Sequence, residues 1–233
     1  MVSSITLKNL IIGYHSKHQL RAIASPVHAS LQAGELTCLI GANGVGKSTL
    51  LRTLAGFQPA LDGEILIQDK SLSDFSAQEL AREISIVLTS KTDHAQLSAE
   101  EIVGIGRSPY TGFWGTLSTA DKQIVASALQ ETGIQHLAQR NIIELSDGER
   151  QKVMIAKALA QQTRIIILDE PTAFLDVVSR IEIMHLLHRL AVEQDKAILL
   201  STHDIEQALV LSDKLWLLTK GKGLQYGVTE DLI

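Results

Sequence analysis

The stretch "GANGVGKST", residues 41–49, decides the fold. It matches the pattern G-x-x-x-x-G-K-[ST] and lies between an apolar run, "LTCLIG", and a helical run, "STLLRTLAGF", the setting that a phosphate-binding loop requires. Its glycines let backbone N–H groups point inward at phosphate oxygens, and the helix N-terminus adds positive potential. Lys47 is predicted to neutralise the β- and γ-phosphates, and Ser48 to offer its hydroxyl to Mg²⁺. The alternative is a glycine-rich turn that only connects a strand to a helix.

Composition is that of an ordinary globular protein. The 233 residues are 45% hydrophobic, which is ample for one large domain or two small ones. The formal net charge of -5, without a dense Lys/Arg run, argues against sequence-independent binding of nucleic acid. Cys38 is the one cysteine and is predicted to be a small buried hydrophobe, which fits a reducing cytoplasm. Without a long apolar run or a signal-peptide layout, we expect the chain neither to span a membrane nor to be exported.

Alternating strand and helix signals surround the loop and predict an α/β chain with a helical insert. The expected strands cover residues 4–14, 36–41, 63–68, 164–171 and 197–202, followed by a hairpin at 214–227. Helices are expected at 48–57 and roughly 177–194, and helical signals dominate 76–133. The run "RIIILDEP" is continuously apolar until its end, as in a parallel strand buried on both faces.

Two carboxylates, Asp169 and Glu170, end that apolar strand, where their burial needs a reason. Ligands of open α/β sheets gather at the carboxyl ends of strands, so these acids should meet the phosphates. Adjacent strand residues point to opposite sides, which predicts that Asp169 holds Mg²⁺ through water while Glu170 acts as general base. His203, after the strand "AILLST", can touch the γ-phosphate and orient a base or water. The alternatives are a solvated strand end and an ordinary core or loop histidine.

A second loop, "ELSDGERQK" at residues 144–152, also runs into a helix. Ser146 and Glu149 have the spacing of a capping box, so this loop can simply start the helix. The same serine hydroxyl, the Gly148 N–H and the helix N-terminus can also bind an anion. Since the first loop already occupies one side of the nucleotide, the second can close over the γ-phosphate on another copy, which predicts a dimer.

The order of phosphate loop, "LSDGE", "IIILDEP" and "STHD" resembles the ATP-binding cassette of ABC transporters over essentially the whole chain. The resemblance implies an α/β fold: a P-loop NTPase (RecA-like) core with an antiparallel β subdomain and a helical signature-motif subdomain. It implies one ABC ATPase domain, 1–233, with the core and β subdomain at 1–88 and 160–233 and the helical subdomain at 89–159. In that family two cassettes sandwich two ATP molecules head to tail, and their closure drives a membrane permease.

The same resemblance assigns roles to residues. The catalytic residues are Lys47, Glu170 and His203, and the Mg²⁺ contacts are Ser48 and Asp169. ATP is expected at Tyr14, Gly41, Ala42, Asn43, Gly44, Val45, Gly46, Lys47, Ser48 and Thr49. Tyr14 matches the aromatic residue that stacks on adenine, although a tyrosine in a strand is more often packing. The signature residues that act on the partner's ATP are Leu145, Ser146, Asp147, Gly148 and Glu149, and the loop linking the two sites contains Ala173, Leu175 and Asp176.

A narrower resemblance concerns "EIVGIGRSPYTGFWG" and "ELSDGERQKVMIAKALAQ", which look like cassettes of iron-siderophore, haem and cobalamin importers. By composition "GRSPY" is only a turn with a basic residue, as in a surface loop. The resemblance implies integral-membrane permease subunits, a homodimer of the ATPase, an indirect link to a periplasmic or surface substrate-binding protein, no nucleic acid, and a peripheral position on the cytoplasmic membrane face. The alternatives are an ABC transporter for another substrate, a soluble ABC protein acting on nucleic acid or ribosomes, and a P-loop small-molecule kinase.

Two departures from the family pattern affect the site. Thr89 stands where such cassettes place a glutamine that senses Mg²⁺ and the attacking water, so its hydroxyl is a third candidate metal contact with a shorter reach. Asp147 replaces a glycine of "LSGGE" and brings a negative charge towards a γ-phosphate. We therefore expect weaker ATP-driven closure than in a cassette with two glycines.

Overall fold

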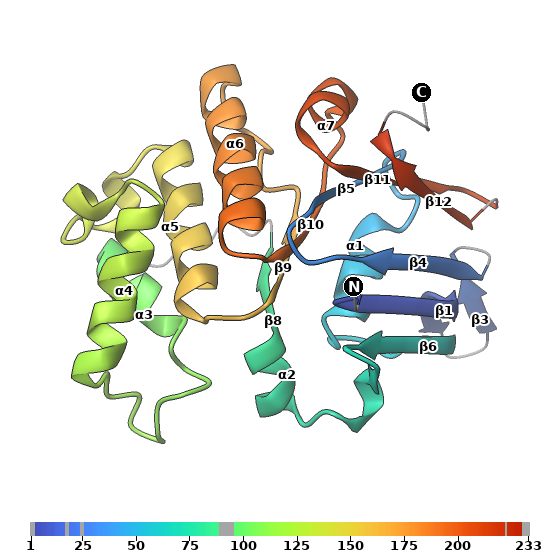
Figure 1. The fold of residues 1–233 in the computed structure, drawn as a ribbon, viewed down its shortest axis with the longest axis horizontal. Helices are drawn as coiled ribbons and strands as arrows, with labels where there is room; N and C mark the ends of the chain where they lie inside the picture. Colours follow the sequence, from blue (N-terminus) through green and yellow to red (C-terminus); the bar gives the residue numbers. More distant parts are fainter. Residues whose placement is uncertain (1–2, 17–18, 24–25, 89–95, 222, 230–233) are drawn as a thin grey trace.

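A computed structural model describes residues 3–16, 19–23, 26–88, 96–221 and 223–229. Two β-sheets and a group of helices form three adjoining parts, shown in Figure 1: helices at one end, a mainly parallel sheet in the middle and an antiparallel sheet at the other end. None of the helices in these ranges is long and apolar enough to cross a lipid bilayer.

The central sheet has six strands in the order β12-β11-β5-β10-β9-β8. Five of these strands run parallel, and β12 pairs antiparallel with β11. Their bounds are β5 (Leu36–Ile40), β8 (Ile84–Val87), β9 (Ile165–Asp169), β10 (Ala197–Ser201), β11 (Lys214–Thr219) and β12 (Gly223–Val228). Every residue of β5, β9 and β10 is buried, because both faces of this sheet are covered.

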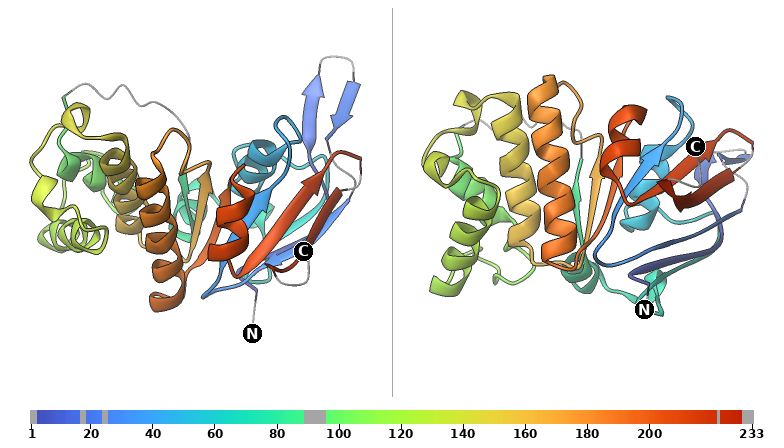
Figure 2. Two further views of the ribbon diagram at one scale, coloured as in Figure 1. Left: turned by 90° about the horizontal axis from the view of Figure 1, so that it is seen from above. Right: turned by 45° about the horizontal axis from the view of Figure 1, so that its top comes forward.

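Helices lie on one side of the central sheet, as Figure 2 shows. α5 (Asp147–Ala160) and α6 (Val177–Glu193) pack against the sheet, whereas α3 (Ala99–Ile105) and α4 (Thr119–Glu131) pack on α5. Residues alternate along β9, so Ile166 and Leu168 belong to the core with these helices, while Ile165 and Ile167 belong to the core on the opposite face. The continuous apolar run is therefore divided between two cores.

The opposite face packs on α1 (Lys47–Leu54) and on an antiparallel sheet of order β4-β1-β6-β7. These strands are β1 (Ile5–Ile11), β4 (Val27–Leu31), β6 (Asp62–Ile67) and β7 (Lys70–Ser71), and a separate hairpin joins β2 (Gly13–Ser16) to β3 (Gln19–Ala22). The remaining elements are α2 (Ala77–Glu83), α7 (Ile205–Leu211) and three 3-10 turns, η1 (Leu72–Asp74), η2 (Gln135–Leu137) and η3 (Ile142–Glu144). Because α1 contributes Leu50, Leu51 and Leu54 to this core, the helix after the phosphate loop is firmly anchored.

The expected architecture, an α/β core with an antiparallel part and a helical part, is confirmed. Some details differ: the strand expected at 4–14 is divided into β1 and β2, and β3, β4, β7 and α7 were not expected. The missed elements are short, so the periodicity that would predict them is weak. Cys38 is fully buried as predicted, and burial raises the pKa of its thiol to about 12.

Candidate functional site

The phosphate-binding loop joins β5 to α1 and ends on a glycine that no other residue can replace without strain. Gly46 has φ 113°, and a Cβ there would lie 2.4 Å from Ile23 Cγ2. As the residue preceding α1, Gly46 has no side chain with which to cap the helix. The first N–H groups of α1 are consequently left for an external acceptor.

Every other α-helix in the described ranges starts at a side chain that accepts a backbone N–H. The capping side chains are those of Ser76, Ser98, Ser118, Ser146, Asp176 and Asp204. Capping by serine or aspartate satisfies one of the otherwise unpaired donors of a helix start. The helix start without such a cap is therefore the one that the sequence predicts to receive phosphate.

Lys47 is buried inside the loop, and its position suits a phosphate ligand. Its Nζ donates to the Gly41 carbonyl at 2.8 Å and lies 3.9 Å from Glu170 Oε1. The predicted ATP-contacting residues Ala42, Asn43, Gly44 and Ser48 are exposed, whereas Val45 and Thr49 are buried. The loop thus presents its backbone to solvent while two of its side chains anchor it.

Asp169 and Ser48 come together although 121 positions separate them. Ser48 Oγ donates to Asp169 Oδ1 at 3.2 Å, and Ser201 Oγ donates to the same oxygen at 2.7 Å. Hydroxyl and carboxylate oxygens are the hard ligands that Mg²⁺ prefers, so Ser48 and Asp169 fit this ion when phosphate oxygens complete its coordination. Among the described residues no three His, Cys, Asp or Glu side chains gather into a metal-binding group.

Ser201 is a site residue that the sequence analysis missed. It ends β10, next to β9, and its Oγ also accepts the Glu170 backbone N–H at 2.9 Å. Both carboxylate residues are therefore fixed by one hydroxyl. The available signal was a serine at the carboxyl end of the apolar strand "AILLS".

Glu170 does not continue β9. The prediction that strand alternation separates the roles of Asp169 and Glu170 is therefore wrong in its reason. β9 ends at Asp169, and Glu170 has φ 47°, in the left-handed region. The two acids point differently because the chain turns there, and not because of strand alternation. Such uncommon backbone at a non-glycine residue is typical of functional sites.

His203 lies beside Glu170, as the sequence predicts. Its Nδ1 is 3.8 Å from Glu170 Oε2, and 57% of its side chain is exposed. A histidine this exposed is not part of the core, and it stands on the solvent side of the carboxylate. The geometry allows the imidazole to face a ligand and Glu170 together.

Tyr14 lies at the edge of the same region. It belongs to β2, is half exposed, and its hydroxyl is 2.6 Å from Thr49 Oγ1 in α1. The tyrosine is therefore neither a core residue nor remote from the phosphate loop. Its exposed ring is available for stacking.

The signature stretch begins α5 with the predicted capping box. Glu149 accepts from the Ser146 backbone N–H at 2.8 Å and from its hydroxyl at 2.9 Å, while Ser146 caps Glu149 N–H. These bonds, first that of the backbone N–H, lower the pKa of Glu149. Leu145 is buried beneath, and a Cβ on Gly148 would lie 2.8 Å from Ser179 Oγ. The close approach of α6 therefore explains a glycine at position 148 without any ligand.

The charge of Asp147 is balanced, which the sequence analysis did not foresee. Asp147 Oδ1 forms an ion pair with Arg150 Nη2 at 2.5 Å, one helical turn away. Among the described residues no hydrogen bond or ion pair joins 145–149 to 41–49, and Figure 1 draws α6 between α5 and β5. Within one chain these two anion-binding candidates do not meet.

The loop "AFLD" leads into α6. Leu175 is buried, Ala173 is partly exposed, and Asp176 is the N-cap of α6, accepting the Ser179 N–H at 2.9 Å and its hydroxyl at 2.9 Å. The hydrogen bond from the Ser179 N–H is the main cause that lowers the pKa of Asp176. Phe174, between Ala173 and Leu175, is 80% exposed and has a φ of 66°. Asp176 thus shapes the loop while Phe174 faces solvent.

The "GRSPY" run is a turn with Ser108 and Tyr110 exposed, as composition leads one to expect, but its basic residue is buried and not on the surface. Arg107 is 5% exposed and donates to Asp121 at 2.9 Å, to the Ala160 carbonyl at 2.8 Å and to Gln162 at 2.9 Å. Its guanidinium also lies 4.1 Å from the centre of the Tyr110 ring. A buried cation with this many partners holds α3, α4 and α5 together.

Thr89, the third candidate metal contact, lies outside the described residues.

Comparison with known proteins places these features in a family. The model of the ABC transporter family matches residues 24–173. The uncharacterized ABC transporter ATP-binding protein MJ0873 of Methanocaldococcus jannaschii is 39% identical over 226 residues, covering 97% of this chain and 77% of that protein. The iron(3+)-hydroxamate import ATP-binding protein FhuC of Bacillus subtilis is 35% identical over 232 residues, covering 100% of this chain and 85% of that protein.

Solved structures agree with the fold. A metal-chelate type ABC transporter in an inward-facing conformation has a chain with a TM-score of 0.85 at 28% identity, covering 99% of this chain and 85% of that one. The dimeric ATP-binding cassette MJ0796 bound to ADP and Pi has a TM-score of 0.81 at 27% identity, covering 97% and 98%.

Proposed function

The chain belongs to the ABC transporter family as one of its ATPases, and we propose that it powers a permease that imports a metal chelate of the iron-siderophore, haem or cobalamin type. One observation carries the proposal: Lys47, Ser48 and Asp169 meet Glu170 at the carboxyl edge of the sheet, next to the α-helix start that lacks a side-chain cap. The import direction and the kind of chelate rest on the similarity to FhuC and to the metal-chelate type transporter.

In the proposed reaction each side chain has one task. Lys47 and the N–H groups at the start of α1 bind the phosphates, and the exposed Tyr14 ring stacks on the base. Ser48 and Asp169 would hold Mg²⁺, which would supply positive charge against the phosphates. Glu170 accepts the proton of the attacking water, and the neighbouring His203 orients that water against the γ-phosphate.

The signature stretch requires a second copy to act. Since residues 145–149 do not reach the phosphate loop of their own chain, they are proposed to face the nucleotide of a partner. Exposed apolar side chains of Phe174, Val177 and Val178 at the start of α6 support a contact surface there. The related cassette MJ0796 is dimeric.

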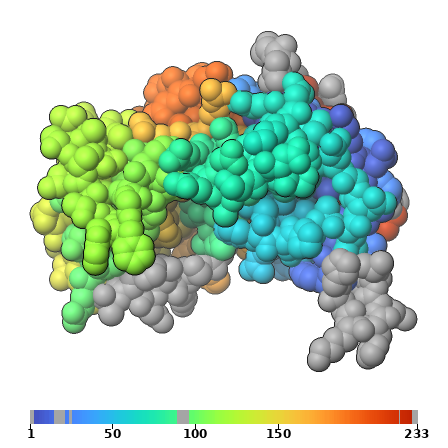
Figure 3. All heavy atoms as spheres, turned by 90° about the horizontal axis from the view of Figure 1, so that it is seen from below, coloured from blue at the N-terminus to red at the C-terminus, as the bar shows by residue number. Residues whose placement is uncertain are grey.

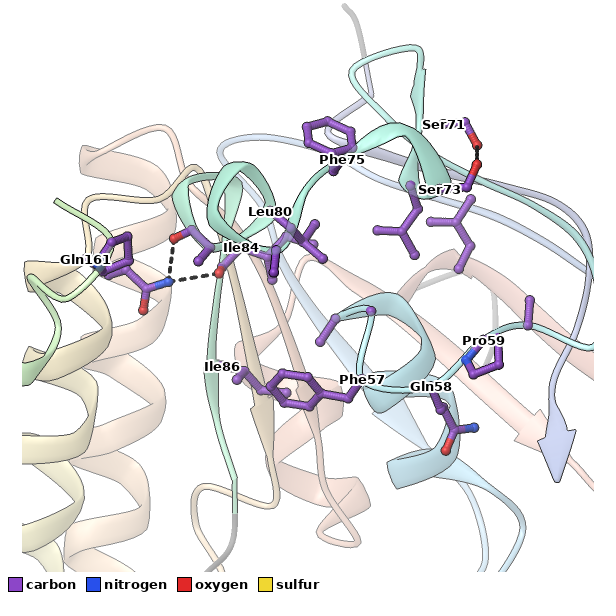
Figure 4. Close-up of a pocket in the computed structure, with 18 of the residues that line it drawn as sticks. Phe57, Gln58, Pro59, Ser71, Ser73, Phe75, Leu80, Ile84, Ile86 and Gln161 are labelled. Atoms are coloured by element: carbon purple, nitrogen blue, oxygen red, sulfur yellow. Dashed lines mark hydrogen bonds between the residues drawn. The ribbon is translucent and has the colours of Figure 1, made fainter. Parts of the chain in front are cut away.

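The permease is proposed to dock on the lower face of the molecule in Figure 1, at the cytoplasmic side of the membrane. A pocket of about 880 Å³ opens there between the helical part and the antiparallel part (Figures 3 and 4). Leu80, Ile84 and Ile86 line it, and Phe57 is 61% exposed at its side. Gln161 fixes its far wall by donating to the Ala81 and Ile84 carbonyls at 2.7 and 3.0 Å. An apolar concave surface of this size suits the end of a helix.

The mechanism is tested with Glu170→Gln protein. Its rate of ATP hydrolysis is measured, and its oligomeric state is measured by light scattering with ATP, with ADP and without nucleotide, always with Mg²⁺. We expect hydrolysis to fall about a hundredfold or more, because the general base is lost, and an ATP-dependent dimer to accumulate. Glu193→Gln, an exposed glutamate on α6, is the matched control and should behave as wild type. Unchanged hydrolysis in Glu170→Gln would contradict the assigned role.

The remaining alternatives predict other partners. A transport ATPase co-purifies with an integral membrane protein, and loss of Lys47 should abolish growth on the transported iron or cobalt source. Recovery with ribosomes alone would favour a soluble ABC protein. A phosphorylated small-molecule acceptor would favour a kinase.

A further inference from the structure

Two aromatic rings project from the segment between α3 and α4. Phe113 is 95% exposed and Trp114 is 87% exposed, and their ring centroids lie 5.4 Å apart at an interplanar angle of 85°. Single exposed apolar residues are normal, but two adjacent large rings left almost wholly in solvent are a candidate binding feature.

A tight turn presents these rings. Gly115 N–H donates to the Gly112 carbonyl at 2.9 Å, so Phe113 and Trp114 occupy the two central positions of a β-turn. A Cβ on either glycine would meet nothing within 4 Å, which shows that the turn stands clear of the rest of the protein.

The base of the turn is held firmly. Tyr110 donates its hydroxyl to the Gln161 carbonyl at 3.0 Å, and its ring covers the buried Arg107 guanidinium at 4.1 Å. The aromatic pair is therefore displayed by a fixed support, and little order has to be gained when it binds.

The charge and the position of the turn indicate which kind of surface Phe113 and Trp114 contact. No Asp, Glu, Lys or Arg occurs from Ser108 to Ala120, so the turn itself brings no ionic group to be desolvated. Arg82 lies at its base, where its guanidinium already donates to the Pro109 carbonyl at 3.1 Å. Ser108 and Pro109, just before it, line the pocket proposed for the permease, and the segment lies on the same lower face (Figures 1 and 3). The turn therefore stands beside the face directed at the membrane.

We propose that the turn 112–115 inserts Phe113 and Trp114 into the headgroup region of the lipid bilayer beside the permease. A tryptophan places its ring at the apolar boundary and keeps its N–H among polar groups, as is typical of membrane interfaces. Lipid can accept the two rings without a groove of matching shape and without ionic contacts. The turn has neither a groove nor a charged residue. The inference rests on the proposed function for the orientation of this face.

Fluorescence on vesicles without any permease tests the proposal. The full chain is tethered by an N-terminal histidine tag on a long Gly/Ser linker to phosphatidylcholine vesicles that contain a nickel-chelating lipid, so that its orientation stays free. Trp114 should shift its emission to the blue and be quenched by bromine-labelled acyl chains, and high salt should not reverse this, because no charges take part. Trp114→Phe keeps only Trp216, which is fully buried, and should show neither effect.

Substitutions sharpen the result. Phe113→Ser should weaken the Trp114 quenching about tenfold, whereas Val210→Ser, which removes another exposed apolar side chain on α7, should leave it unchanged. Emission of Trp114 that is identical on vesicles and in solution would overturn the proposal. So would shielding of Trp114 that arises only when a permease is present, since the occupant would then be protein. Because dimer formation is measured without membranes, failure of the proposed function is detected separately.

Discussion

The starts of α1 and α5 are built in opposite ways although both are candidates for binding phosphate. α1 follows Gly46, has no side-chain cap and carries no acidic residue in its first turn. α5 is closed by its own capping box and carries Asp147 and Glu149 in its first turn. One helix start leaves its donors open, and the other satisfies them internally.

The difference indicates a division of labour between the two sites. An open, positive helix start binds an anion strongly on its own, whereas a start already occupied by a carboxylate adds only a modest attraction. ATP should therefore bind first and tightly at α1 of one copy, and the α5 start of a second copy should add a weaker contact. A weak second contact suits a dimer that must open again after hydrolysis.

The largest effect is expected from Lys47→Met, which removes the cation from the open site. ATP affinity should fall about a hundredfold, because a buried charge-assisted contact to phosphate is worth about 3 kcal/mol. Lys152→Met, which breaks the surface pair with Glu182, is the matched control and should bind ATP normally. Titration with a fluorescent nucleotide measures both, and equal affinities would remove the contrast between the two helix starts.

An intermediate effect is expected from Ser146→Ala, which opens the α5 start. Loss of the cap should lower the free energy of unfolding by about 1 kcal/mol in urea titrations at neutral pH. Glu149 also accepts from the Ser146 hydroxyl, and this bond lowers the Glu149 pKa in the folded state, second to the backbone N–H of Ser146, which the variant keeps. The part of the stabilisation that comes from the hydroxyl is present above the ordinary glutamate pKa and is lost as pH falls through the lowered value, so the gap between wild type and variant should narrow in part in acid. A gap that stays constant at low pH would show that the hydroxyl bond to the carboxylate does not contribute.

The smallest effect is expected from Asp147→Gly. The sequence alone predicts that Asp147 repels the partner's γ-phosphate and weakens closure, but Arg150 pairs with this carboxylate at an exposed site. ATP-dependent dimerisation of Glu170→Gln protein should strengthen only about threefold, since the charge is already partly balanced. Arg150→Gln should change it in the opposite direction. Dimer affinities from sedimentation that are unaffected by both substitutions would show that Asp147 does not face a phosphate.

Several parts of the site could be predicted because their residues are neighbours in the chain. The phosphate loop, the two acids Asp169 and Glu170 and the capping box of α5 each lie within a few positions of the sequence, and local backbone geometry alone relates their members. The ion pair of Asp147 with Arg150 was also within reach, because residues three apart meet on a helix.

Contacts between distant segments could not be predicted in this way. Ser201 reaches Asp169, and Ser48 reaches the same carboxylate, because β10 lies between β5 and β9 in the sheet. Strand order along the chain does not give this neighbour order. Arg107 is a second case, since its burial depends on α4 and α5 converging on it.

The sequence by itself determined the phosphate loop, the buried strand with two acids at its end, and the signature stretch. Each is a short pattern with local physical requirements, and together they indicate the ABC ATPase family. Only the tertiary structure decided which helix start remains open, that the Asp147 charge is balanced, that Arg107 is interior, and that Phe113 and Trp114 stand in solvent. The physical reason is that burial and pairing depend on elements far apart in the chain, whose meeting is fixed by sheet order and packing.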